Sequence, residues 1–240
     1  MGNSDFLRRW WHSGTRRAEP VTEGRSEMLD RLRMGGVVDP AVLEAMAAVP
    51  REEFVTEGHE GAAYADRALP IGHGQTISQP LMVGILVQAL RLRPGDRVLD
   101  VGTGSGYQAA VIAACGARVT SIERVERLGA VARLRFARLG VDVEVVTGDG
   151  TLGVPDRAPF DAVAVAAASP WPPPLALLRQ LAPGGRLVIP MHRDGDEDER
   201  LVRFTRVDRD GTARWPHEDL GPCRFVPLIG EAGYTAGDEV

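Results

Sequence analysis

The segment 97–107, with the sequence RVLDVGTGSGY, constrains the fold more than any other part of the chain. An apolar run at 98–101 indicates a buried strand, and glycines follow at 102, 104 and 106 before a helical pattern begins at Gln108. Because glycine has no Cβ, such a turn can adopt positive φ and expose backbone N–H groups at the positive end of a helix. The sequence therefore predicts a strand–turn–helix unit that holds a nucleotide-like cofactor.

The spacing of these glycines distinguishes two classes of cofactor. A dinucleotide-binding loop has the pattern G-x-G-x-x-G, whereas here the third glycine comes one position early and Tyr107 takes the sixth position. Asp100 leads into the loop, and Glu123 ends the next predicted strand, where a carboxylate can accept hydrogen bonds from ribose hydroxyls. We therefore favour S-adenosylmethionine over NAD. A turn without any ligand is disfavoured, because one tight turn rarely needs three glycines.

Strand and helix patterns alternate after the loop. Apolar strands are predicted at VTSIE, DVEVV, FDAVAVAAA and GGRLVIP, with an arginine-rich helix over 126–139 and another over 175–181. Continuous apolar strands with helical crossovers are typical of a parallel sheet covered on both faces. LVRFTRV and CRFVPLI are predicted to be closing strands that add antiparallel order at the edge. The fold class is thus α/β and Rossmann-like, with a mostly parallel central sheet.

The N-terminal part is predicted to form a helical cap. Residues 1–25 contain five arginines and a Trp10-Trp11 pair without sustained periodicity, which indicates a flexible or loosely docked arm. A short helix is expected to begin with Ser26 as its cap, and a second helix to open at Asp39-Pro40.

The segment 64–79, YADRALPIGHGQTISQ, is predicted to be a structured loop with a functional role. Pro80 then opens a short buried helix, which places Ser78 at its mouth. On local grounds alone, Ser78 fits a helix cap about as well as a catalytic residue.

Composition argues against several kinds of partner. The 28 basic and 33 acidic residues give a net charge of −5, which does not favour nucleic acid or an anionic membrane. No apolar stretch approaches the roughly 20 residues of a membrane span. The five histidines lack close acidic or cysteine partners, so we expect no metal site. Cys115 and Cys223 are expected to be reduced thiols, and the protein to be a cytoplasmic monomer.

Several motifs resemble, in order, those of the protein-L-isoaspartate O-methyltransferase family. They are AYADRALPIGHGQTISQP, PGDRVLDVGTGSGYQAAVIA, VTSIERV, GDG, APFDAVAV, APGGRLVIP and RFVPL. The likeness runs from about residue 27 to about residue 229, and GHGQTIS is its specific signature. The resemblance implies an S-adenosylmethionine-dependent methyltransferase fold that acts on isoaspartyl proteins or peptides.

The resemblance also implies roles for individual residues. Ser78 matches the catalytic position, and the cofactor-binding positions correspond to Ile77, Asp100, Gly102, Gly104, Glu123, Asp149 and Gly150. The sequence departs from the family pattern at Ala166, at 171–174 (WPPP) and at Met191-His192. We expect one methyltransferase domain over 26–240, with a cap and active-site loop at 26–95, a cofactor-binding core at 96–190 and closing strands with a tail at 191–240.

Three functions remain open at this stage. The first is a repair enzyme that methylates isoaspartyl residues in many proteins, which leads to a succinimide. The second is a relative dedicated to an aspartyl side chain of one ribosomally made peptide, which would form an aspartimide. The third, a non-catalytic cofactor-binding protein, is disfavoured because both the TIS and the glycine segments are intact.

Overall fold

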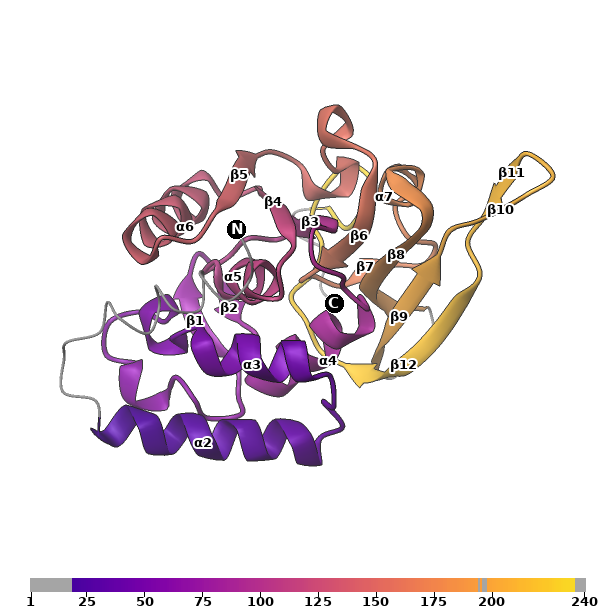
Figure 1. Cartoon of the computed structure of the whole chain (residues 1–240). Helices are drawn as coiled ribbons and strands as arrows, with labels where there is room; N and C mark the ends of the chain where they lie inside the picture. The colour runs from indigo at the N-terminus through magenta and orange to yellow at the C-terminus, as the bar shows by residue number, and fades with distance from the viewer. Residues whose placement is uncertain (1–18, 194, 196–197, 236–240) are drawn as a thin grey trace.

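The fold is built around one large sheet in the computed structural model, which describes residues 19–193, 195 and 198–235. The strands lie in the order β12-β9-β8-β6-β3-β4-β5, and β7 pairs with β8 (Figure 1). The pairs from β5 across to β8 are parallel, whereas β9 and β12 run antiparallel, which confirms the mostly parallel sheet. The strand bounds are β3 (Arg97–Val101), β4 (Arg118–Glu123), β5 (Val143–Thr147), β6 (Phe160–Val165), β7 (Ser169–Pro170), β8 (Leu181–His192), β9 (Glu199–Thr205) and β12 (His217–Cys223).

Helices cover both faces of this sheet, because successive side chains of a strand point to opposite sides. Val98 and Ala162 belong to a hydrophobic cluster shared with α4 and α5, while Leu99 and Val163 belong to a second cluster shared with α7. The predicted two-sided α/β arrangement is therefore confirmed. The helix bounds are α2 (Glu19–Met34), α3 (Pro40–Ala48), α4 (Pro80–Ala89), α5 (Tyr107–Ala114), α6 (Glu126–Leu139) and α7 (Leu175–Arg179).

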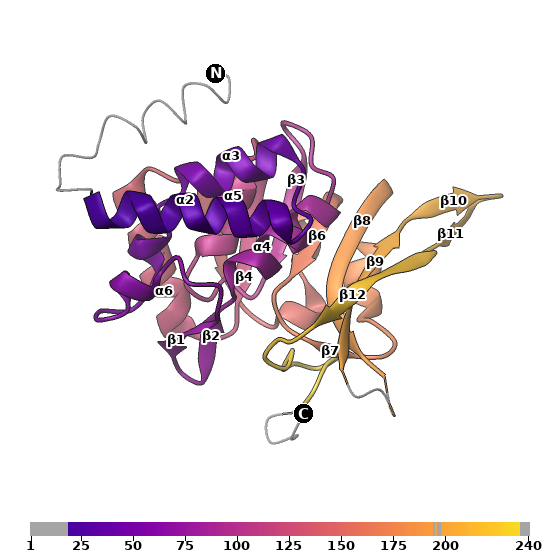
Figure 2. The same ribbon diagram turned by 90° about the horizontal axis from the view of Figure 1, so that it is seen from below.

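The helices α2, α3 and α4 gather on one side of the molecule as the expected cap (Figure 2). Asp39 caps α3, because its Oδ1 accepts a hydrogen bond from the N–H of Ala41 at 2.9 Å. The prediction that Ser26 caps the preceding helix is wrong: α2 already runs from Glu19, so Ser26 lies inside it. Periodicity within 26–34 could not reveal the earlier turns. The prediction of a flexible or loosely docked arm is wrong for residues 19–25, because they belong to α2. The rest of the predicted arm, residues 1–18, lies outside the described residues.

The segment 64–79 contains a small β-hairpin, β1 (Leu69–Gly72) with β2 (Gln75–Ile77). Its turn uses positive φ at three successive residues, Gly72 (88°), His73 (54°) and Gly74 (69°). The glycines make this turn possible, and the hairpin delivers Ile77 and Ser78 to the start of α4.

The C-terminal part differs from the prediction. LVRFT forms β9, but the second closing strand is His217–Cys223, and most of CRFVPLI runs outside the main ladder. Instead, the carbonyl of Val226 accepts a hydrogen bond from the N–H of Ala168 at 2.8 Å, and the N–H of Leu228 donates to the Ala168 carbonyl at 2.7 Å. An unpredicted hairpin, β10 (Val207–Arg209) with β11 (Thr212–Arg214), projects beside β9 and β12 (Figure 1).

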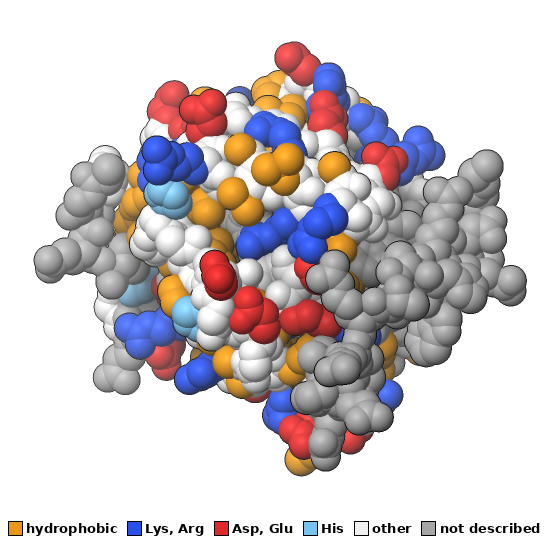
Figure 3. All heavy atoms as spheres, turned by 90° about the vertical axis from the view of Figure 1, so that its left-hand side faces the viewer, with side chains coloured by type: hydrophobic (Ala, Val, Ile, Leu, Met, Phe, Trp, Pro, Cys, Tyr) orange, Lys and Arg blue, Asp and Glu red, His pale blue; other side chains and the backbone are white. Residues whose placement is uncertain are grey.

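On the face drawn in Figure 3, acidic and basic side chains are interspersed with uncharged ones, so neither sign of charge dominates that face. Among the described residues, no helix combines the length and the apolar character that crossing a membrane requires.

Candidate active site

The glycine loop adopts the conformation that its sequence requires. Gly102, Gly104 and Gly106 have φ of 92°, 50° and 94°, and Gly106 leads directly into α5. A Cβ on Gly106 would lie 2.8 Å from the ring of Phe136, and one on Gly104 would lie 3.3 Å from Ile71. The loop is therefore closely packed on one side while its backbone lines a cleft on the other.

Glu123, at the end of β4, braces this loop. It is 6% exposed, its Oε2 accepts a hydrogen bond from the N–H of Gly104 at 2.8 Å, and its Oε1 accepts from the N–H of Val125 at 2.8 Å. A carboxylate has about four acceptor positions, so two remain for a ligand. Because Glu123 also lines the cleft, it can accept hydrogen bonds from vicinal hydroxyls there.

Asp100 lies behind the loop and not in the cleft. It has no exposed surface; Gln108 donates to its Oδ1 at 2.7 Å and Ser121 to its Oδ2 at 2.6 Å. Burial raises the pKa of Asp100 to about 6, although the hydrogen bonds from Ser121 and Gln108 oppose this shift. In this structure Asp100 connects β3, β4 and α5 from beneath the cleft, and its role in holding the cofactor stays a prediction.

Asp149 also stays outside the lining of the cleft, although its neighbour Gly150 lines it. Its Oδ1 accepts from the N–H of Thr151 at 2.8 Å, and its Oδ2 accepts from the N–H of Glu231 at 2.7 Å. Burial by itself raises the pKa of Asp149, but the hydrogen bonds from the Glu231 N–H and from the hydroxyl and N–H of Thr151 together outweigh it and hold the pKa below its usual range. In this structure Asp149 fastens the C-terminal turn beside the cleft, and its contact with the cofactor stays a prediction.

The cleft has a volume of about 850 Å³, its open mouth included. It brings together six of the eight predicted site residues: Ile77, Ser78, Gly102, Gly104, Glu123 and Gly150. A smaller hollow of about 330 Å³ adjoins it, and the two share Thr76, Ser78, Ala166 and Val226.

Ser78 lies between the two hollows. It is half-buried, and its hydroxyl makes no hydrogen bond with the part of the chain that the structure describes. The residue before α4 is Gln79, which makes no side-chain cap, so the alternative role of Ser78 as a helix cap is not supported. Its hydroxyl is free to donate to a ligand.

Sequence reasoning missed two contributors to the site. The segment 226–229 forms one wall of the cleft, and the RFVPL motif was its only local signal. Arg224, next to that wall, is exposed, and of the described residues lining the smaller hollow it alone is charged. Among the described histidines, cysteines and acids, no cluster of three or more could hold a metal ion.

The fold and the cleft define the class of protein. A glycine loop between β3 and α5, an acid at the end of β4 and a cleft at the carboxyl ends of parallel strands are the features of a Rossmann-like, S-adenosylmethionine-dependent methyltransferase. Residues 23–233 match the family model of protein-L-isoaspartate(D-aspartate) O-methyltransferase, PCMT. The chain belongs to this family.

Individual relatives agree with this assignment. The protein-L-isoaspartate O-methyltransferase of Methylorubrum extorquens (strain PA1) is 51% identical over 221 residues, covering 90% of this chain and 94% of the relative. That of Aeropyrum pernix is 48% identical over 231 residues, covering 94% and 86%.

Solved structures show the same similarity. A protein-L-isoaspartate O-methyltransferase matches with a TM-score of 0.75 at 28% identity, covering 87% of this chain and 67% of the other. A putative family member from Plasmodium falciparum, solved in complex with S-adenosyl-L-homocysteine, matches with a TM-score of 0.70 at 26% identity, covering 85% and 98%.

Proposed function

We propose that this protein is an S-adenosylmethionine-dependent carboxyl O-methyltransferase that acts on L-isoaspartyl residues of damaged proteins and peptides. The methyl ester then leads to a succinimide and so to repair. The position of Ser78 between two adjoining hollows carries this proposal, because methyl transfer requires donor and acceptor to meet at one point.

The residues of the larger cleft fit the cofactor. Gly102, Gly104 and Gly150 offer backbone without Cβ atoms, and Glu123 offers free acceptor positions for the ribose hydroxyls. A Cβ on Gly150 would lie 2.6 Å from Val101, so this close approach of the backbone needs glycine. When bound, S-adenosylmethionine supplies an electrophilic methyl group on a sulfonium.

The smaller hollow fits the substrate. An isoaspartyl residue presents a free α-carboxylate, which is ionised at neutral pH because its pKa is about 3.5. No strong general base is therefore required. Arg224 attracts this anion to the hollow, and the Ser78 hydroxyl donates a hydrogen bond that orients the reacting oxygen.

Most departures from the family pattern lie outside the two hollows, which favours broad substrate recognition. Ala166 lines both hollows, whereas residues 171–174 and Met191-His192 line neither. Trp171 instead stacks under Arg193, whose guanidinium carbon is 4.1 Å from the ring centroid. With most of these departures outside the two hollows, the site itself keeps the family pattern, which suits repair of many sequences better than one dedicated peptide.

Replacing Ser78 with alanine tests the catalytic assignment. We expect kcat to fall about tenfold to 150-fold, the equivalent of a lost hydrogen bond to a charged group, about 1.5 to 3 kcal/mol. The affinity for S-adenosylhomocysteine should stay nearly unchanged. Initial rates and calorimetric titrations on the same preparation measure both, with the exposed Ser26→Ala on α2 as the matched control. Unchanged kcat in Ser78→Ala would refute the assignment.

Substrate scope separates repair from a dedicated peptide. Labelled-methyl transfer is measured on several unrelated isoaspartyl peptides and on their aspartyl twins. Repair predicts methylation of the isoaspartyl set only. Activity confined to one aspartyl peptide would favour the dedicated enzyme, and binding of S-adenosylhomocysteine without any transfer would favour a non-catalytic protein.

We also propose a cytoplasmic monomer. Both cysteines, Cys115 and Cys223, are free thiols, as is typical of reducing compartments. Light scattering of the purified protein tests the monomer, and fractionation of cells tests the compartment.

A further inference from the structure

Arg51, at the start of η1 (Arg51–Phe54), is a buried cation that forms no ion pair with any acid of the described residues. It is 0% exposed, and none of the ion pairs found within the described chain involves it. Burying an unpaired charge is costly, and an apolar side chain of similar volume would often serve stability as well or better. The position of Arg51 therefore calls for a reason beyond packing.

The contacts of Arg51 supply that reason. Its Nη2 donates to the backbone carbonyl of Ser78 at 2.7 Å, and its Nε donates to the carbonyl of Ala63 at 2.7 Å. Its guanidinium carbon lies 4.6 Å from the centroid of the Tyr107 ring, within the range of a cation–π contact. One planar group thus joins three separate segments, and two of them, those of Ser78 and Tyr107, line the cleft.

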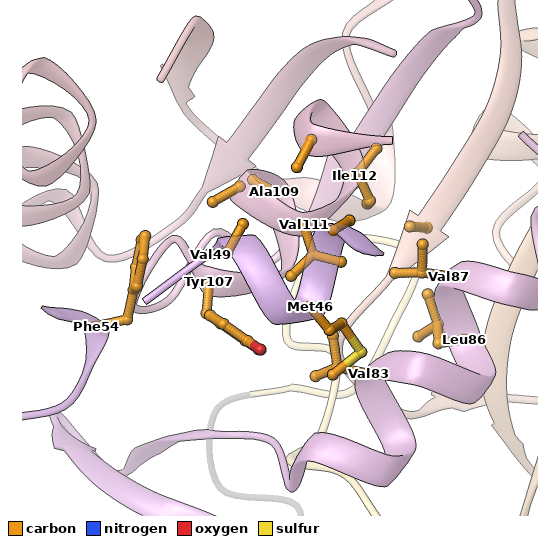
Figure 4. Packing of buried hydrophobic residues seen from close by; sticks show 14 of the residues in the cluster. Met46, Val49, Phe54, Val83, Leu86, Val87, Tyr107, Ala109, Val111 and Ile112 are labelled. Carbon is orange, nitrogen blue, oxygen red and sulfur yellow. The ribbon is translucent and has the colours of Figure 1, made fainter. Parts of the chain in front are cut away.

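Tyr107 links this arrangement to the glycine loop. It is the first residue of α5, it lines the cleft, and its ring packs edge-on against Phe54 at 5.6 Å between centroids. Figure 4 shows Tyr107 within the buried cluster, between Phe54 and Met46. Burial lowers the pKa of Arg51 and raises the pKa of Tyr107, and the interaction of the guanidinium with Tyr107 opposes both shifts.

We propose that Arg51 is a positioning residue: by holding the carbonyl of Ser78 and resting on the ring of Tyr107, it fixes the Ser78 hydroxyl relative to the glycine loop. This inference rests on the proposed methyl transfer. A rigid fork with two parallel donors suits this task, whereas an ammonium on a flexible stem does not. The hydroxyl of Ser78, which lines the smaller hollow, and the glycine loop, which lines the larger cleft, are then held in a fixed relative position.

Substituting Arg51 distinguishes positioning from simple stabilisation. Arg51→Lys keeps the charge but cannot hold both carbonyls in the same plane, and Arg51→Met removes both hydrogen bonds. We expect kcat to fall about tenfold in Arg51→Lys and about a hundredfold in Arg51→Met, because a misplacement of about 1 Å can cost a hundredfold in rate. The dissociation constant of S-adenosylhomocysteine should stay within about twofold of the unmodified protein in Arg51→Lys.

Arg186, which is half-buried and also pairs with Asp96 at 3.1 Å, provides a control for the loss of carbonyl contacts outside the site. It also donates to two backbone carbonyls, from Nε to Leu90 at 2.7 Å and from Nη2 to Arg91 at 2.8 Å, but it lines neither hollow. Arg186→Met should lower the melting temperature and leave kcat per folded molecule unchanged. If Arg51 only stabilises the fold, Arg51→Lys should behave in the same way, and that result would overturn the inference.

A double-mutant cycle completes the test. If Arg51 acts through the Ser78 hydroxyl, Arg51→Lys should cost little further rate once Ser78 is alanine. If the decreases in kcat of Arg51→Lys and Ser78→Ala are fully additive in free energy, the inference is contradicted, even if Arg51→Lys alone has a low kcat. Failure of the unmodified protein to methylate any isoaspartyl peptide would instead refute the proposed function, so the two failures are distinguishable.

Discussion

Replacing Glu123 with glutamine should weaken cofactor binding strongly while leaving the fold intact. Both carboxylate oxygens accept backbone N–H groups, from Gly104 and from Val125, each at 2.8 Å. Glutamine has nearly the same shape, but its amide group presents donors where one of these oxygens was. One of the two backbone N–H groups must then lose its acceptor. The ribose hydroxyls of the cofactor also lose a negatively charged hydrogen-bond acceptor.

The magnitude follows from the kind of hydrogen bond that is lost. A hydrogen bond to a charged group contributes about 1.5 to 3 kcal/mol, and about 1.4 kcal/mol corresponds to a tenfold change in an equilibrium constant. We therefore expect the dissociation constant of S-adenosylhomocysteine to rise about tenfold to 150-fold in Glu123→Gln. Calorimetric titration measures it directly.

A second substitution controls for the loss of one negative charge. Glu144 on β5 is paired with Arg157 on the exposed surface, away from the cleft, so Glu144→Gln should leave the dissociation constant nearly unchanged. The reasoning is refuted if Glu123→Gln binds S-adenosylhomocysteine within twofold of the unmodified protein. Saturable binding of NAD in its place would refute the identity of the cofactor as well.

Two further predictions concern the frame of the site. Gly106→Ala should lower the free energy of unfolding by about 2 kcal/mol or more, because φ is 94° there and the new Cβ would lie 2.8 Å from Phe136; urea unfolding tests this, with the exposed Gly61→Ala, which meets open space, as the control. Asp100→Asn should change the pH dependence of stability. Because burial raises the pKa of Asp100 to about 6, the folded state holds this proton more tightly than the unfolded state, and stability falls as pH rises from about 4 to about 6. In Asp100→Asn, which has no charge at this position, the free energy of unfolding should not show this fall of roughly 3 kcal/mol. Urea unfolding of both proteins at pH 4.5 and 7.5 measures it, and an equal change with pH in the two proteins would contradict the prediction.

The local elements of the fold could be predicted because their signals lie within a few residues of each other. The glycine spacing predicted the turn between β3 and α5, and the helix predicted over 126–139 is α6, Glu126–Leu139. The start of α2 could not be predicted in the same way. Ser26 is a good cap by residue type, but the helix had begun seven residues earlier, and no pattern at 19–25 indicated it.

The site was predictable only in part, because equal residue types at similar positions have different surroundings. Asp100 and Glu123 are both acids on neighbouring strands, but Glu123 lines the cleft while Asp100 is sealed beneath α5. Which carboxylate meets the ligand depends on the side to which the strand turns it and on what covers it. Only the packed structure supplies that information.

By itself, the sequence determined the class of fold, the cofactor loop and the family motifs, since backbone conformation at glycines and the periodicity of apolar residues are local properties. The tertiary structure decided the rest. It turned the segment 226–229 away from the sheet ladder to pair with Ala168, where it forms a wall of the cleft. It also buried Arg51 against the carbonyl of Ser78, 27 positions along the chain. Such contacts join residues that only the completed packing brings together, because hydrogen bonds between distant segments leave no periodic trace in the sequence.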